Sequence, residues 1–142
     1  MPTIARKCVP FTPFDRELSK ATVALVTSAG VHRKDQPGFN IADDLGDLTF
    51  RIIKGDVNAS DLMVTHHHYD HGDADADVNV VFPIEPLREL AAEGFIGAVA
   101  GEHIGYMGFT MRLKDMYEQT APEIASEIDK KSRADIVVLT GG

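Results

Sequence analysis

Short apolar runs alternate along the chain with longer segments whose apolar positions recur at helical spacing. The runs are nearly continuous in apolar residues, which is typical of strands buried on both faces. They predict strands at residues 22–27, 49–53, 62–65, 95–100 and 135–140. Between them, spacing of three and four residues predicts one helix over residues 84–91 and a second over residues 113–128, in which Pro122 is expected to cause a kink or a division.

Strands that alternate with helices favour βαβ units, whose right-handed crossovers build a parallel sheet covered by helices on both faces. We therefore expect a three-layer α/β/α fold with a mostly parallel sheet, flavodoxin-like or related. Residues 21–142 are expected to belong to this single α/β domain. Residues 1–20 carry three prolines and no clear period, which predicts an extended N-terminal arm.

The segments that follow the predicted strands are chemically distinctive. They are residues 30–32, residues 66–73, the glycine-rich residues 101–108, which are predicted to form a loop, and residues 141–142. In parallel α/β sheets, ligands bind outside the carboxyl ends of the strands. We therefore expect these four segments to meet at one edge of the sheet and to form a site there. Glycine is entropically costly, so Gly101, Gly105 and Gly108 suggest close backbone approach or positive φ.

Composition and charge narrow the class of protein. The 142 residues are 44% hydrophobic and 25% charged, which is ordinary for one globular domain and argues against disorder. The net charge of −8 opposes binding to a phosphate backbone, so no nucleic-acid partner is expected. No apolar run approaches the ~18 residues of a membrane span, and no signal peptide is visible. We expect a cytoplasmic protein that does not bind membranes.

A cluster of imidazoles and carboxylates occupies residues 66–77, with four histidines inside six residues. Such side chains are ligands of zinc, iron and manganese, and the spacing is similar to that in metallohydrolase loops. The candidate ligands share this one segment and are His66, His68, His71 and Asp73. A metal site would need further ligands from distant loops, where the only remaining histidines are His32 and His103. A metal-binding module or metal-dependent hydrolase is therefore one hypothesis.

A second interpretation treats His66 and Asp70 as an ionisable pair in a cleft. Histidine titrates near neutral pH, and a neighbouring carboxylate would orient it and favour its charged form. Such a pair can move protons, or hold the carboxylate and amine of a substrate. Cys8, the only cysteine, excludes an internal disulfide and is expected to be incidental. The chain thus offers acid–base candidates and no convincing nucleophile.

Short motifs recur in a fixed order over residues 9–142. They are residues 23–32, 34–36, 63–66, 69–70, 79, 82–84, 86–88, 93–96, 104–108, 120–125 and 137–140. In this order they resemble the selenoprotein B family of glycine, sarcosine, betaine and D-proline reductases. The N-terminal arm and residues 94–96 are most similar to the D-proline-reducing members of that family.

The resemblance implies a reaction shared between two subunits. A pyruvoyl group on a sister subunit condenses with the amine of a small amino-acid substrate, and a selenolate attacks Cα and breaks the Cα–N bond. D-proline, opened to 5-aminovalerate, is the expected substrate, and component B of a glycine, sarcosine or betaine reductase is the alternative. A hetero-oligomer and an electron-donating thiol or selenol protein are also implied, with no cofactor bound by this chain itself. A third possibility is a relative of these reductases that has no catalytic activity and acts as a partner domain.

The resemblance also places the expected site. In that family the selenocysteine follows the strand that resembles residues 135–140 and two small residues. Here those are Gly141 and Gly142, so selenocysteine is expected directly after Gly142, and the domain is expected to be incomplete at its C-terminus because UGA also reads as stop. The expected catalytic residues are His32, His66 and Asp70, and the expected substrate-binding residues are Tyr69, Gly105, Gly141 and Gly142.

One departure from the family pattern falls inside this site. Members that reduce D-proline tend to show His-Gly-Gly-Tyr-Asp-Asn, whereas residues 66–71 of this chain read His-His-His-Tyr-Asp-His. The added imidazoles leave both the substrate and an additional metal site open.

Overall fold

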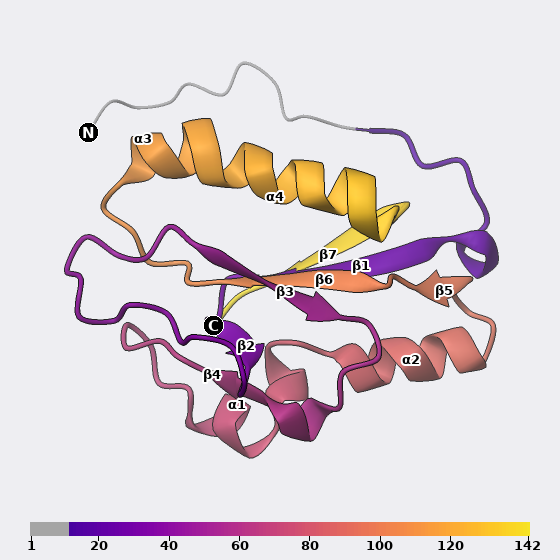
Figure 1. Ribbon diagram of the computed structural model, residues 1–142. Helices are drawn as coiled ribbons and strands as arrows, with labels where there is room; N and C mark the ends of the chain where they lie inside the picture. The colour runs from indigo at the N-terminus through magenta and orange to yellow at the C-terminus, as the bar shows by residue number, and fades with distance from the viewer. Residues whose placement is uncertain (1–11) are drawn as a thin grey trace.

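A five-stranded sheet with helices on both faces forms the centre of the molecule (Figure 1). The computed structural model describes residues 12–142. The strands, in chain order, are β1 (Thr22–Thr27), β3 (Phe50–Lys54), β5 (Ala98–Val99), β6 (Glu102–Tyr106) and β7 (Ile136–Thr140). β1 lies in the middle, parallel to β7 along one edge and to β5 and β6 along the other, while β3 is antiparallel to β6. The α/β/α architecture with a mostly parallel sheet is confirmed, whereas a flavodoxin-like sheet is not confirmed, because β3 runs antiparallel to β6.

β1 is buried on both faces because its side chains are almost all apolar. Val23 and Leu25 enter the apolar cluster on one face, and Ala24 and Val26 enter the cluster on the other. The apolar run that predicted this strand therefore gave its bounds correctly.

The two helical layers lie on opposite faces of the sheet (Figure 1). One layer contains α1 (Gly72–Ala76) and α2 (Ile84–Ala92). The other is one continuous helical segment made of α3 (Leu113–Asp115), a π-helical turn (Met116–Thr120), α4 (Ala121–Glu127) and a second π-helical turn (Ile128–Ser132). Pro122 does not divide it, since Pro122 lies in the first turn of α4 directly after the first π-helical turn. Short 3₁₀ turns occupy Leu18–Lys20, Ala59–Asp61 and Val78–Val80.

A separate antiparallel pair, β2 (Val31–Arg33) and β4 (Leu62–Val64), packs against one face of the main sheet. The run at residues 62–65 was expected to join the parallel sheet, and this expectation is wrong. The close contact is with β6, where a Cβ on Gly105 would lie 2.0 Å from the carbonyl oxygen of Val31. Only glycine allows the backbone of β2 to approach β6 this closely.

The long strand beside β1 is β6, in residues that were predicted to form a loop. Of the predicted strand at residues 95–100, only Ala98–Val99 pairs with β1. Between this pairing and that of β6, Ala24 and Leu25 face the four residues 100–103, which form a bulge. The imidazole of His103 fills the gap, since its Nδ1 accepts a hydrogen bond from the backbone N–H of Leu25 at 2.9 Å.

Residues 12–20 lie exposed at the surface and lead into the start of β1. The backbone N–H of Gly97 donates to the carbonyl of Leu18, and Arg16 forms an ion pair with Asp135. The rest of the predicted arm, including Cys8, lies outside the described residues. Over residues 12–142, no helix combines the length and the hydropathy that a membrane crossing needs.

Candidate functional site at the carboxyl edge of the sheet

The turn after β1 connects the ends of the neighbouring strands. The backbone N–H of Ser28 donates to the carbonyl of Thr140 at the end of β7 (3.0 Å), and the N–H of Gly30 donates to the carbonyl of Tyr106 at the end of β6 (2.9 Å). The carbonyl of Gly30 in turn accepts from the N–H of Thr65, the residue after β4 (2.9 Å). The structure therefore brings the ends of β1, β4, β6 and β7 to one edge of the fold.

The side chain of Tyr69 contacts several of the segments that meet at this edge. Its hydroxyl donates to the carbonyl of Ala29 in the turn after β1 (2.9 Å), and its ring meets the ring of His66 edge-on, with 4.9 Å between centroids. Burial, and next the charge of Asp75, raises the pKa of Tyr69, so the hydroxyl stays protonated at neutral pH. Gly142 lies against this ring, because a Cβ built on Gly142 would be 2.3 Å from Cζ. Tyr69, His66 and Gly142, three of the expected site residues, are thus neighbours.

His66 is only 8% exposed, and its hydrogen bonding defines its tautomer. Its Nδ1 accepts from the backbone N–H of His68 at 3.1 Å, so the proton of the neutral ring lies on Nε2. Burial, followed by the nearby imidazoles of His68, His67 and His71, lowers the pKa of His66 below its ordinary value. At neutral pH the ring is therefore a neutral hydrogen-bond donor.

The expected pairing of His66 with Asp70 needs a correction. The Oδ1 of Asp70 accepts from the backbone N–H of Gly72 at 3.1 Å, where α1 begins, and the side chain is exposed. The carboxylate of Asp70 therefore does not stabilise the charged form of His66. Burial and the neighbouring imidazoles favour its neutral form.

His32 has a different place from the one expected of a catalytic residue. It is 2% exposed, and both ring nitrogens are occupied. Its Nδ1 lies 2.8 Å from the carbonyl oxygen of Arg33, to which it must donate, and its Nε2 lies 2.7 Å from the hydroxyl of Thr65. The imidazole therefore ties β2 to the residue that precedes His66. This geometry supports a positioning role and leaves no ring nitrogen for a substrate.

The remaining expected residues divide between the edge and the interior. Gly105 lies inside β6 beneath β2, so it serves packing and does not face Gly142. Gly141 lies beside Ser28, whose Oγ would be 3.5 Å from a Cβ at position 141. Ser28 was not among the site residues expected from the sequence. The signal that marks it is its place in the Ser-Ala-Gly turn directly after the most buried strand.

The alternative set of metal ligands is separated by other contacts. Nδ1 of His71 pairs with the carboxylate of Asp75 at 2.7 Å, one turn away. The ring of His68 stacks on Phe109, with 3.4 Å between centroids and 14° between planes. Among residues 12–142, no three His, Cys, Asp or Glu side chains are arranged to hold a metal ion. The geometry thus gives no support to a metal centre in this cluster.

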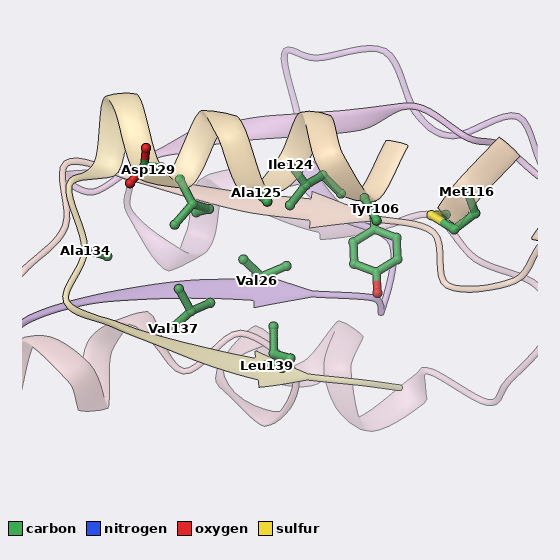
Figure 2. A pocket seen from close by; sticks show the side chains of 11 residues that line it. Val26, Tyr106, Met116, Ile124, Ala125, Asp129, Ala134, Val137 and Leu139 are labelled. Atoms are coloured by element: carbon green, nitrogen blue, oxygen red, sulfur yellow. The ribbon is translucent and has the colours of Figure 1, made fainter. Parts of the chain in front are cut away.

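An apolar groove of the described part of the chain has none of these polar groups in its lining; Figure 2 shows its lining residues. It has a volume of about 410 Å³ and lies between the helical segment 113–132 and the strands β1 and β7. Its lining is almost entirely apolar and includes Val26, Tyr106, Ile124, Ile128, Val137 and Leu139. It supplies shape and apolar surface, whereas the groups with useful chemistry gather near Gly142.

Comparison with known proteins gives the family. The glycine/sarcosine/betaine reductase selenoprotein B family matches residues 1–142. The chain is 49% identical over 132 residues to the D-proline reductase subunit gamma of Acetoanaerobium sticklandii, which covers 93% of this chain and 53% of that protein. It is 33% identical over 143 residues to the glycine reductase complex component B subunit gamma of Carboxydothermus hydrogenoformans, covering 99% of this chain and 32% of that protein.

A third relative is the sarcosine reductase complex component B subunit beta of Peptoclostridium acidaminophilum, 32% identical over 110 residues, which is 76% of this chain and 25% of that protein. The chain therefore spans about half the length of the D-proline reductase subunit and a third or less of the other two. No solved structure matches it significantly. The match over the whole chain, together with the motifs at the carboxyl edge, shows that the chain belongs to the glycine/sarcosine/betaine reductase selenoprotein B family.

Proposed function

We propose that this chain is part of the selenium-bearing component of a reductase that cleaves the Cα–N bond of D-proline to give 5-aminovalerate. The relative with 49% identity is a D-proline reductase subunit, and this supports D-proline over glycine, sarcosine or betaine. The observation that carries the proposal is the contact of Gly142 with Tyr69, which itself packs against His66, at the edge where β1, β6 and β7 end.

The proposed nucleophile is a selenocysteine directly after Gly142, and a pyruvoyl group on a sister subunit is proposed to make the Cα–N bond an acceptable leaving bond. The residues present fit a selenolate at this position. The phenol of Tyr69, which stays protonated, lies against Gly142, and the neutral imidazole of His66 packs on Tyr69, so neither of these side chains brings a negative charge to this position. A selenol is more acidic than a thiol, so at neutral pH such a position would carry the reactive anion.

His66 is proposed to bind the substrate through its Nε2–H. A neutral donor in a mostly buried position can bind a carboxylate oxygen of an amino acid without competing for its protons. Such a contact would orient Cα toward the chain that follows Gly142. His32 would act through Thr65, by fixing the backbone from which His66 extends.

The proposed partners follow from the same arrangement. Asp70, His67 and His68 are exposed around Tyr69, so this edge is open to a second subunit that carries the pyruvoyl group. A protein with a reduced thiol or selenol is the proposed electron donor. The net charge of −8 supports neither nucleic acid nor another polyanion as a partner.

The test is a substrate panel on the assembled complex. The gene would be expressed with its full reading frame and selenocysteine insertion, together with the pyruvoyl-bearing partner, and supplied with a dithiol reductant. We expect 5-aminovalerate from D-proline, and little turnover of glycine, sarcosine or betaine. Reduction of one of those three amines in place of D-proline would refute the substrate. Loss of all turnover in a complex with full selenium and pyruvoyl content would refute the proposed function.

A further inference from the structure

Gly142 lies on the face of an aromatic ring. A Cβ built on Gly142 would be 2.3 Å from Cζ of Tyr69 and 2.6 Å from both Cε1 and Cε2. These distances are far below any real carbon–carbon contact, and they involve three adjacent ring atoms. The backbone of Gly142 therefore rests against the ring at a distance that only a residue without a side chain permits.

The ring of Tyr69 is held in place and cannot simply turn aside. Its hydroxyl is anchored on the carbonyl of Ala29, at 2.9 Å, and Ala29 is fully buried in the turn that joins the strand ends. Its ring is also packed edge-on against His66. A side chain at position 142 would thus have to displace either the segment that follows β7 or an anchored ring.

Two other glycines, Gly101 and Gly141, do not share this constraint. A Cβ on Gly101, at the opposite end of β6, would meet no atom within 4 Å. A Cβ on Gly141 would meet only the Oγ of Ser28 at 3.5 Å, which is an ordinary contact. Of the two glycines that follow β7, only Gly142, which touches Tyr69, therefore requires the absence of a side chain.

We propose that Tyr69 is a positioning residue. The contact between its ring and the backbone of Gly142 sets the direction in which the chain continues after Gly142. The backbone hydrogen bond from Ser28 to Thr140 fixes the end of β7, and Tyr69 fixes the second residue beyond it. This role differs from the substrate-binding role expected for Tyr69. It rests on the proposed function in one respect, namely that the residue after Gly142 is the nucleophile.

The contact between Tyr69 and Gly142 can be tested without an activity assay, by NMR of the full chain. Backbone protons that lie over an aromatic ring are shielded, so the Hα protons of Gly142 should resonate upfield of their random-coil position. Tyr69→Leu should remove this shift, and Tyr69→Phe should keep most of it because the ring remains. Gly142→Ala should release residue 142 from the ring, whereas Gly101→Ala should leave the Gly142 signals unchanged. Random-coil shifts for Gly142 in the unsubstituted chain would show that Gly142 does not lie on the ring of Tyr69, and would overturn the proposal.

The positioning role is tested by steady-state kinetics of the assembled reductase. Because misplacement of a reacting group by about 1 Å can cost ~100-fold in rate, Tyr69→Leu and Gly142→Ala should lower kcat by about 10- to 100-fold while KM changes little. Tyr69→Phe should restore much of kcat, and Tyr117→Leu, a matched change at an exposed helical position, should have no effect. A rise in KM at unchanged kcat would show that Tyr69 binds substrate and would overturn the proposal. If no amine is reduced by the unsubstituted complex, the proposed function fails. The NMR result still shows whether Tyr69 holds Gly142 in place.

Discussion

At the scale of single residues, the histidines of this chain have distinct roles that follow from their hydrogen bonds. Both ring nitrogens of His32 are hydrogen-bonded, and His103 is buried and accepts from the backbone N–H of Leu25. His66 accepts from the backbone through Nδ1 and has its Nε2–H next to the strand ends. The sequence showed that these imidazoles lie near predicted strand ends. It could not show which nitrogen of each ring is occupied, because the local partners of His32 and His66 depend on the backbone conformation and the partner of His103 lies 78 residues away.

His66 is predicted to act as a hydrogen-bond donor. Replacing it with leucine removes a contact to a charged carboxylate, which is worth about 1.5–3 kcal/mol and corresponds to a loss of roughly 10- to 150-fold in kcat/KM. His66→Gln retains an N–H donor and should lose much less. The measurement is kcat/KM for D-proline with both variants in the assembled complex. Equal losses in the two variants would contradict a donor role.

His103 is predicted to make the fold sensitive to acid. Burial, and next the positive charge of Arg88, lowers the pKa of His103 from 6.5 to about 4. The unfolded chain binds a proton at higher pH than the folded chain, so the contribution of His103 is complete above pH 6.5 and is lost as the pH falls toward 4. A difference of this size corresponds to about 3 kcal/mol.

The measurement for His103 is urea unfolding at pH 7, 5.5 and 4, with the free energy of unfolding compared between the unsubstituted chain and His103→Gln. The variant should be less stable at pH 7, because the N–H of Leu25 loses its present acceptor, and should lose less stability on acidification. Parallel pH dependences in the two proteins would show that other groups control the acid response.

At the scale of elements, the hydrophobic pattern predicted a strand that is apolar throughout. It failed for a strand that contains residues needed for contacts with its neighbours. β1 was predicted with its observed bounds because both of its faces are buried among apolar side chains. β6 was mistaken for a loop because Gly105 makes room for β2 and His103 fills the bulge beside Leu25. Both residues look like loop residues until the neighbouring strand is known.

Gly105→Ala is predicted to destabilise the contact between β6 and β2. The added Cβ would lie 2.0 Å from the carbonyl oxygen of Val31, and a backbone atom cannot move aside as a flexible side chain can. Overpacking of this kind costs up to about 3 kcal/mol. Urea unfolding at pH 7 measures the loss, with Gly101→Ala as the matched control at an unconstrained glycine. Unfolding free energies that agree for both variants would contradict the close approach of the two backbones.

At the scale of the whole molecule, β7 presents an apolar strand at the edge of the sheet. Leu139 is 75% exposed, and Val137 and Val138 are more than a third exposed beside the groove of Figure 2. Exposed apolar edge strands are templates for association. The sequence predicted the apolar run of β7 but not its place at the edge, which depends on pairing with β1 alone among the described strands.

The 142-residue chain by itself is predicted to self-associate through this edge. Leu139→Lys should shift it toward the monomer, because a charge on an edge strand opposes pairing. Leu113→Lys, an equally large change at an exposed helical position, should have little effect. Light scattering after size-exclusion chromatography over a concentration series measures the result. A monomer at every concentration without substitution would contradict the role of the edge.

The central claim is that the nucleophile of the reaction acts at the carboxyl edge, directly after Gly142. The most direct measurement is mass spectrometry of the selenium-bearing subunit in its complex after brief alkylation, with and without D-proline. We predict an alkylated selenocysteine in the peptide that continues from Gly142, and protection of that residue by D-proline. A peptide with another residue at that position, or a selenocysteine whose alkylation D-proline leaves unchanged, would contradict the claim.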